Sequence, residues 1–378
     1  MEKVSILGCK SYNITQLDKI IEKHFVLLEV DGKLIKKGDK VAIKPNLLLK
    51  KTPEQATTTH PEFIAAIIRA VKRRGGIPII AESPGGPFTK GNLKGVYSFT
   101  GMEEIALREG AELNFDIGWQ EVSAENYSVC SAFNIINPIL EADVIISAAK
   151  LKTHGMMNYS GAVKNLFGVV PGLMKPEFHF RFRDKTSFAN MIVDLCQTVK
   201  PTISFIDGIM GMEGNGPSGG EPKLAGITAA SKNPHALDLL CSRLIGMSVQ
   251  EVYTVDAAIK RGLCPATIAE LKIVGENAET LLCEFRKPET RSNEFLGNIK
   301  IPKFLRKPIE NLLTPKPEIV KATCIGCAKC AESCPQHIIS IIEHKAVIDY
   351  SKCIKCYCCH EMCPEKSIRI KTFRLFGW

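Results

Sequence analysis

The chain has 378 residues, of which 45% are hydrophobic and 24% charged, and its mean hydropathy is +0.03. This is the composition of a water-soluble globular protein of two or three domains. No apolar run reaches the roughly 18 residues of a membrane span, and the first residues lack a secretory apolar stretch, so we expect a cytoplasmic protein. The formal net charge of +9 is not accompanied by interleaved aromatic residues, which argues against a nucleic-acid partner.

Short apolar runs alternate with amphipathic helical patterns across residues 1–285. The segments "VAIKPN", "IPIIAESPGG", "ADVIISAAK" and "TISFIDG" have the composition of buried strands. Residues 60–76, "HPEFIAAIIRAVKRRGG", predict a helix with Pro61 in its first turn and Gly75 at its end. "NPHALDLLCSRLIGM" predicts another helix with Asn233 as its N-cap. The alternation indicates an α/β domain with a mainly parallel sheet.

Polar residues follow several of these predicted strands. Lys44 and Asn46 come after "VAI", Lys152 and His154 after "VIISAA", and Asp207 after "ISFI". Ligands of open α/β sheets bind beyond the carboxyl ends of the strands, so these residues predict one shared site. The alternative for each of them is a solvated polar loop.

The stretch "LKTHGMMNYSGAVKNLFG", residues 151–168, extends this predicted site. Gly155 and Gly161 interrupt it, so we expect an irregular loop rather than a helix or a strand. Lys164 could hold a carboxylate or phosphate, or form an imine if its pKa is lowered, and Asn165 lies beside it. We expect the loop to hold a small-molecule substrate or an additional, unidentified cofactor.

Residues 211–220, "GMEGNGPSGG", formally match G-x-G-x-x-G. Pro217 interrupts the match and no helix follows, so we predict no NAD site but a flexible loop over the site. Residues 286–320 are rich in Lys, Arg and Pro and predict a linker between domains.

Residues 321–378 contain nine of the 15 cysteines. "CIGCAKCAESCP" and "CIKCYCCHEMCP" both read C-x2-C-x2-C-x3-C-P, and each cysteine recurs 29 positions later. In such repeats the fourth cysteine of each run binds the other cluster, which predicts two [4Fe-4S] clusters. The first takes Cys324, Cys327, Cys330 and Cys363, and the second takes Cys353, Cys356, Cys359 and Cys334. We expect Cys358 to be a spare thiol packed near a cluster.

The cysteine runs resemble the bacterial two-cluster ferredoxin, which implies a small α+β domain that passes single electrons. Zinc is the competing metal, but its structural sites use pairs of C-x2-C rather than runs of four. With its thiolates bound, each cubane carries about −2, which lowers the net charge from +9 to about +5.

The motifs "VAIKPN", "TTTHP", "AKLKTH", "GAVKNLFGVVPG" and "GMEGNGPSGG" occur in this order and resemble the domain-of-unknown-function family 362. Members often carry a ferredoxin-like domain, and the resemblance implies an α/β fold with a shared site. A fainter similarity to lactate racemases starts at Thr59-His60-Pro61, which lacks their Arg. It implies acid–base roles for His60 and His154, a cofactor anchor at Lys164 and a metal ligand at His179.

Three functions follow from these patterns. The first is an oxidoreductase of anaerobic metabolism whose ferredoxin module passes electrons to the α/β domain, with another ferredoxin or a reductase as redox partner. The second is a non-redox isomerase or racemase in which the clusters are structural. The third is an electron-transfer or cluster-handling protein without catalysis.

Overall fold

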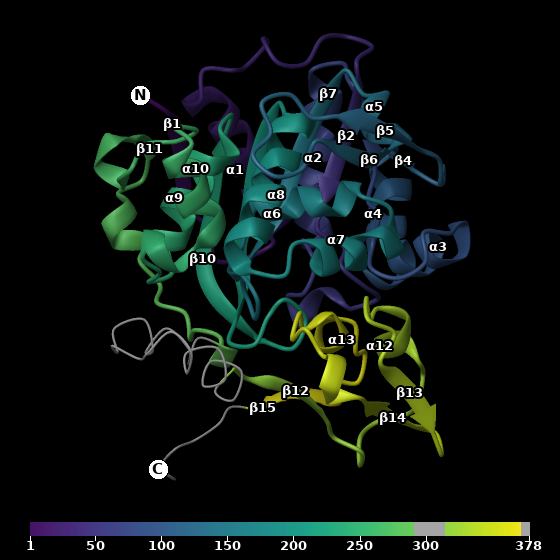
Figure 1. Cartoon of the computed structure of the whole chain (residues 1–378). Coiled ribbons are helices and arrows are strands. Elements are labelled where there is room, and N and C mark those ends of the chain that lie inside the picture. Colours follow the sequence, from purple (N-terminus) through teal and green to yellow (C-terminus); the bar gives the residue numbers. More distant parts are fainter. Residues whose placement is uncertain (291–313, 372–378) are drawn as a thin grey trace.

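The computed structural model describes residues 1–290 and 314–371, so most of the predicted linker lies outside the described residues. Within them, a sheet of nine strands forms the centre of the large domain (Figure 1). Its order is β11 (Lys272–Gly275), β1 (Lys3–Gly8), β10 (Glu221–Ser231), β9 (Ile203–Glu213), β7 (Val144–His154), β2 (Lys40–Pro45), β3 (Ile77–Ile80) and β4 (Glu112–Leu113), with β8 (Asn158–Ser160) paired to β7. This confirms the predicted α/β class and identifies "VAIKPN", "IPII", "VIISAAK" and "ISFID" as strands.

The sheet is mainly parallel, with two exceptions that the sequence patterns do not predict. β10 runs antiparallel to both of its neighbours, β1 and β9, because a short loop of residues 214–220 joins it to β9 as a hairpin. β8 turns back on β7 in the same way. The remaining neighbours pair in parallel, which brings their carboxyl ends to one edge.

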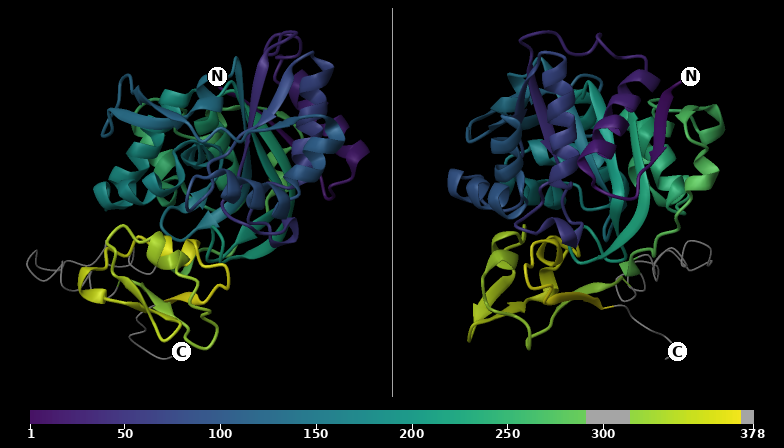
Figure 2. Two further views of the ribbon diagram at one scale, coloured as in Figure 1. Left: turned by 90° about the vertical axis from the view of Figure 1, so that its right-hand side faces the viewer. Right: turned by 180° about the vertical axis from the view of Figure 1, so that it is seen from behind.

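Helices cover both faces of the sheet. The right-hand view of Figure 2 shows α1 and α2 in front of it, and Figure 1 shows α8 and α9 on the other face. The helices are α1 (Ile14–Leu27), α2 (Pro61–Arg73), α3 (Lys90–Phe99), α4 (Met102–Glu109), α5 (Asn137–Leu140), α6 (Ala162–Asn165), α7 (Lys175–Arg181), α8 (Lys185–Val199), α9 (Pro234–Leu244) and α10 (Tyr253–Lys260). β5 (Trp119–Ser123) and β6 (Ala132–Ile136) form a separate hairpin. None of the described helices combines the length and apolar character that a bilayer span requires.

The two predicted helices have the expected ends and buried faces. In α2, Pro61 occupies the first turn and Phe63, Ile64 and Ile67 are fully buried. Asn233 caps α9 by accepting hydrogen bonds from two backbone N–H groups. The period of the apolar residues therefore predicts these two helices correctly.

The expectation of an irregular loop over residues 151–168 is wrong. β7 continues to His154, β8 follows as a short returning strand, and residues 162–165 form the single helical turn α6. The backbone bends at Gly155, whose N–H donates to the carbonyl of Gly216. Pairing with β9 and β8 therefore imposes strand structure on a stretch whose composition does not favour it.

The small module lies below the carboxyl edge of the sheet (Figure 1). It consists of β12 (Lys316–Ile319) paired with β15 (Ile368–Lys371), the hairpin of β13 (Ile339–Ile342) and β14 (Lys345–Ile348), and the short helices α12 (Lys329–Glu332) and α13 (Cys358–Glu361). β13 and β14 lie in the apolar stretches "HIISII" and "KAVIDY". β12 falls within the stretch predicted as linker, because it pairs with the last strand of the module.

The module docks on the large domain mainly through α13 and the residues that follow it. Ser218 Oγ donates to the backbone carbonyl of Glu361 at 2.6 Å, and Lys51 Nζ to that of Pro364 at 2.7 Å. Of residues 211–220, expected to form a flexible loop over the site, the first three belong to β9; the loop of residues 214–220 lines the pocket described below through Pro217 and also contacts the module. A Cβ on Gly219 would lie 2.8 Å from the His360 ring, so only glycine allows the observed approach.

Changing Gly219 to Ala should weaken this docking without unfolding the large domain. Overpacking costs about 1–3 kcal/mol, so amide exchange of residues 358–362 should accelerate roughly tenfold, as measured by hydrogen–deuterium exchange. Gly91→Ala is the matched control, because no atom lies within 4 Å of its Cβ position. Unchanged exchange in Gly219→Ala would show that the close approach is not needed for docking.

Candidate functional site

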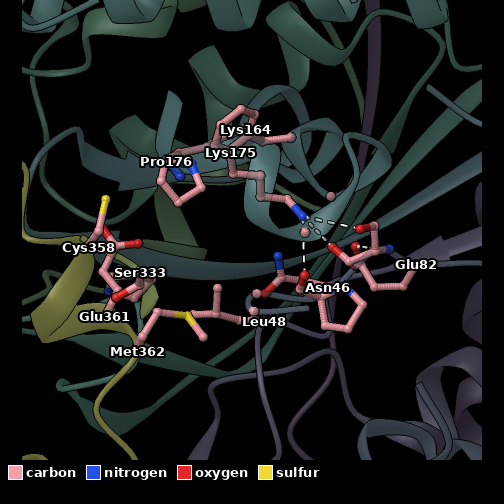
Figure 3. Close-up of a pocket in the computed structure, with 18 of the residues that line it drawn as sticks. Asn46, Leu48, Glu82, Lys164, Lys175, Pro176, Ser333, Cys358, Glu361 and Met362 are labelled. Atoms are coloured by element: carbon pink, nitrogen blue, oxygen red, sulfur yellow. Dashed lines mark hydrogen bonds between the residues drawn. The ribbon is translucent and has the colours of Figure 1, made fainter. Parts of the chain in front are cut away.

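A pocket lies where the carboxyl edge of the sheet meets the small module (Figure 3). It has a volume of about 790 Å³, counted out to the solvent at its mouth. Figure 3 shows Cys358, Glu361 and Met362 of the module on one side and Asn46 and Glu82 on the other. Of the residues predicted from the sequence, the pocket is lined by Asn46, Lys152, Lys164, Asn165 and His179.

Lys44 lies beneath the pocket floor in a fully buried ion pair. Its Nζ is 2.7 Å from Glu82 Oε2 and also donates to Asn165 Oδ1 at 3.1 Å. Burial lowers the pKa of Lys44 and raises that of Glu82, and the attraction between the two opposes both shifts. Lys44 therefore positions Asn165 rather than reaching a ligand itself.

Two further lysines reach the pocket and are held by neutral oxygens. Lys152 Nζ donates to Asn46 Oδ1 and to the carbonyl of Thr57, both at 2.7 Å. Lys175 Nζ donates to the carbonyl of Ser83 at 2.6 Å. Burial lowers the pKa of Lys152 and of Lys175 to about 7, and the positive charge of Lys164 contributes to both shifts.

Lys164 Nζ and His179 Nδ1 have no hydrogen-bond partner within the described residues. Across the described residues Lys164 Nζ makes neither a hydrogen bond nor an ion pair, and it lies 5.7 Å from the centre of the Phe167 ring. His179 stacks on Phe188 at 4.3 Å, and its Nδ1 is buried without a hydrogen bond. Burial lowers the pKa of His179 to about 3, so the ring is neutral at physiological pH.

His154 lies behind the pocket wall and faces the small module. Its Nδ1 accepts hydrogen bonds from the backbone N–H groups of Met156 and Met157, so the neutral ring carries its proton on Nε2. Nε2 lies 3.3 Å from Glu361 Oε1, without hydrogen-bond alignment. Burial lowers the pKa of His154 well below its ordinary value and raises that of Glu361.

Asp238 of α9 fixes the segment that carries Lys164 and Asn165. Its carboxylate accepts from the backbone N–H groups of Ala162 and Val163, at 2.7 and 2.9 Å. These N–H groups begin the helical turn α6. A buried acidic residue on a distant helix therefore sets the position of the predicted loop residues.

His60 and Asp207 lie away from the pocket, in a second polar cluster at the same edge of the sheet. Asp207 is fully buried and accepts from Lys150 Nζ at 2.8 Å, from Tyr12 OH at 2.9 Å and from the backbone of His60. The His60 ring stacks on Tyr12 at 3.5 Å and caps α2, accepting from the backbone of Glu62. Burial lowers the pKa of His60 to about 4.

The eight predicted cluster ligands surround two cavities in the small module. One cavity is lined by Cys324, Cys327, Cys330 and Cys363, and the other by Cys334, Cys353, Cys356 and Cys359. These are the two groups of four that the spacing predicts. The Sγ atoms of Cys324 and Cys363 also accept backbone N–H groups, at 3.4 and 3.2 Å.

Each cavity is lined by four cysteines, the number that a [4Fe-4S] cubane requires, because a cubane binds each thiolate at a different iron. Cys358 lines neither cavity; it is buried and faces the interdomain pocket.

Lys175, Glu361 and Asp238 belong to the site but were not predicted. Lys175 follows the motif "GAVKNLFGVVPG" by three residues, which is the nearest signal for it in the sequence. Glu361 lies between two cluster cysteines, so the sequence around it indicates a metal site and does not indicate a pocket residue. Asp238 is inside a predicted amphipathic helix, and no local pattern shows that it binds a segment 76 positions earlier.

Gly168→Ala should break the buried pair beneath the pocket. The added Cβ would lie 2.0 Å from Glu82 Oε1 and 2.5 Å from Lys44 Nζ, so one of them must move. Disrupting a buried ion pair costs on the order of 3 kcal/mol, which should lower the unfolding midpoint of the large domain by several degrees. Gly155→Ala is the control, because the nearest atom to its Cβ is 3.5 Å away. Equal midpoints in the two variants would contradict the packing described here.

The sequence matches two known domain families. Residues 41–243, more than half of the chain, match the domain of unknown function DUF362, and residues 323–367 match the 4Fe-4S dicluster domain. The small module is therefore a ferredoxin-type iron–sulfur domain.

Related proteins cover most of the chain. The thylakoid-associated protein sll1697 of Synechocystis is 33% identical over 295 residues, which are 76% of this chain and 88% of that protein. The lactate racemase apoprotein of Thermoanaerobacterium thermosaccharolyticum is similar in structure, with a TM-score of 0.39, 12% identity and coverage of 65% of this chain and 57% of that one. A Thermotoga maritima protein has a TM-score of 0.33 and 11% identity over 55% of this chain and 52% of that one. Neither structural likeness bears on function. The chain belongs to the DUF362 family.

Proposed function

We propose that the protein is an oxidoreductase in which the ferredoxin module passes electrons to a small molecule bound in the interdomain pocket. The observation that supports this best is the position of α13. This helix carries the cluster ligand Cys359, and the same turn supplies Cys358 and Glu361 to the pocket wall. A molecule in the pocket would therefore lie within one helical turn of a cluster ligand.

The proposed reaction is a two-electron reduction of the bound substrate. When bound, the [4Fe-4S] clusters supply single electrons at low potential. The substrate takes up two electrons and two protons, and a reduced one-electron carrier, such as another ferredoxin or a reductase of the cytoplasm, supplies the electrons. The protons come from acidic groups of the pocket and ultimately from water.

Lys152 and Lys175 suit the role of proton donors. Both line the pocket, and burial brings the pKa of each to about 7, near the value at which an acid works best in neutral solution. Asn46 retains one amide N–H after donating to Asn165 Oδ1 and can orient the substrate, whereas the amide of Asn165 is fully hydrogen-bonded within the protein and holds Asn46 in place. His154 and Glu361 close the pocket on the side of the module and limit the entry of water.

The proposal can be tested with holoprotein reduced by dithionite under anaerobic conditions. We expect the clusters to be reoxidised by the substrate, sought first among small organic acids, with about two electrons consumed per molecule converted. Lys164→Gln should slow this reoxidation at least about tenfold, because a charged hydrogen bond to the substrate is lost. Reoxidation by ferricyanide, which needs no pocket, should remain unchanged, and Lys260→Gln is the matched control, because the Lys260 side chain of α10 is exposed.

The alternatives make different predictions in the same assay. An isomerase or racemase with structural clusters would convert its substrate without an electron donor. A pure electron carrier would exchange electrons equally well with and without Lys164. Full turnover by a folded variant with Cys324 and Cys353 changed to Ala would also contradict electron delivery.

The pH profile should identify the proton donor. Lys175 faces Glu82, Lys44 and Lys164, and with a pKa of about 7 its ammonium form predominates below pH 7 and its amine form above. If Lys175 supplies a proton, turnover should fall about tenfold per pH unit above pH 7. Lys175→Arg keeps the charge but cannot release a proton, so its turnover should be slow and should not show this fall above pH 7. An identical profile in Lys175→Arg would exclude Lys175 as the donor.

A further inference from the structure

On the basis of the proposed function, we propose that the substrate is an organic anion, a carboxylate or a phosphate ester with an apolar body, whose charged group binds Lys164. This names the chemical class that the interdomain pocket recognises. Four features of the pocket support it: its charge balance, the free ammonium group of Lys164, its apolar wall and its unpartnered buried atoms.

The pocket contains more positive than negative charge. Lys152, Lys164 and Lys175 all line it, while Lys44 and Glu82 neutralise one another at 2.7 Å. The remaining carboxylate in the wall is that of Glu361. Uncompensated buried charge is unfavourable, so a bound anion would relieve the repulsion among the three ammonium groups.

Among these lysines, Lys164 is the one available to a ligand. Lys152 has oxygen acceptors at 2.7, 2.7 and 3.4 Å, and Lys175 has them at 2.6, 3.3 and 3.4 Å, so the protein already holds both ammonium groups, and only a proton in one of the long, weak contacts can turn toward a substrate. No hydrogen bond or ion pair of the described chain involves Lys164 Nζ, although its side chain is half-buried. The three N–H donors of Lys164 are therefore available to a bound molecule.

The wall near Lys164 is apolar and suits an organic body rather than a bare inorganic anion. Apolar side chains of both domains contribute to it: Leu48, Phe167, Leu173, Pro176 and Met362. Lys164 Nζ lies 5.7 Å from the centre of the Phe167 ring, which places the charge next to this surface. A ligand with a charged end and a hydrophobic end would use both features.

Two buried atoms of the pocket residues also lack partners and are available to orient such a ligand. Glu361 is 9% exposed and His179 is 4% exposed, and neither Glu361 Oε1 nor His179 Nδ1 has a hydrogen-bond partner within the described parts of the chain. They come from different domains, so the site is complete only when the module is docked. The carboxylate of Glu361 would repel a second negative group, which favours a ligand with a single anionic group and an uncharged end toward the module.

Calorimetric titration of the anaerobic holoprotein with benzoate, phenyl phosphate and benzamide tests the proposal. Benzamide has the shape of benzoate without its charge. We expect benzoate or phenyl phosphate to bind at least about tenfold more tightly than benzamide, and their relative affinities distinguish a carboxylate substrate from a phosphate ester. In Lys164→Gln this preference should disappear, whereas Lys260→Gln should retain it.

Equal binding of benzamide, or no binding of either anion, would overturn the proposal, and so would an unchanged preference in Lys164→Gln. The comparison within the natural protein decides the question even if the variant fails to fold. Binding requires no electrons, so the result is independent of the proposed redox function. If anions bind selectively while the variant with Cys324 and Cys353 changed to Ala keeps full turnover, electron delivery is refuted and the anion site is not.

Discussion

Buried positive charge at the carboxyl edge of the sheet is the constraint on which the rest of the structure depends. Lys44, Lys150 and Lys152 lie on two neighbouring strands, and each is at most 1% exposed. A buried ammonium group is tolerated only with acceptors around it. Glu82 after β3 and Asp207 on β9 supply charged partners for the first two, and neutral oxygens hold the third. The segments that follow the strands are therefore arranged around these lysines.

The same constraint connects the pocket to the docking of the ferredoxin module. Lys152 reaches the carbonyl of Pro217, and a Cβ on Gly216 would lie 2.1 Å from the carbonyl oxygen of Thr153. The β9–β10 hairpin must therefore approach the end of β7 closely. From that position its Ser218 binds the backbone of Glu361 in the module. Displacing the hairpin would disturb a lysine of the pocket and the docking contact together.

The sequence predicts the elements with a clear period and the metal ligands with a fixed spacing. Helix α2 follows from apolar residues on one face, and the two groups of four cysteines follow from the 29-residue repeat. The antiparallel β10 and the strand structure at residues 151–154 could not be predicted, because they depend on pairing with β9 and β8. Local composition contains no information about such partners.

The sequence indicates the edge of the sheet at which the candidate site lies, but not which residues line it. Of the polar residues expected after strands, Asn46 follows β2, whereas Lys44, Lys152, His154 and Asp207 lie within β2, β7 and β9, and they divide between two clusters. His60 and Asp207 take part in a network in which the Asp207 carboxylate accepts four hydrogen bonds. Such a network fixes the middle of β9 against the start of α2 and leaves little capacity for a ligand.

In the pocket, unlike in this network, some polar atoms have no hydrogen-bond partner. His179 and Glu361 retain buried polar atoms without hydrogen-bond partners, and such atoms are costly unless something binds them. Residue type does not separate the two clusters, since both contain a lysine, a histidine and a carboxylate. The difference arises because Glu361 belongs to the ferredoxin module, which packs against the carboxyl edge of the sheet in the large domain. The unsatisfied atoms are therefore a property of the domain interface, and the interface is where a ligand would replace the missing contacts.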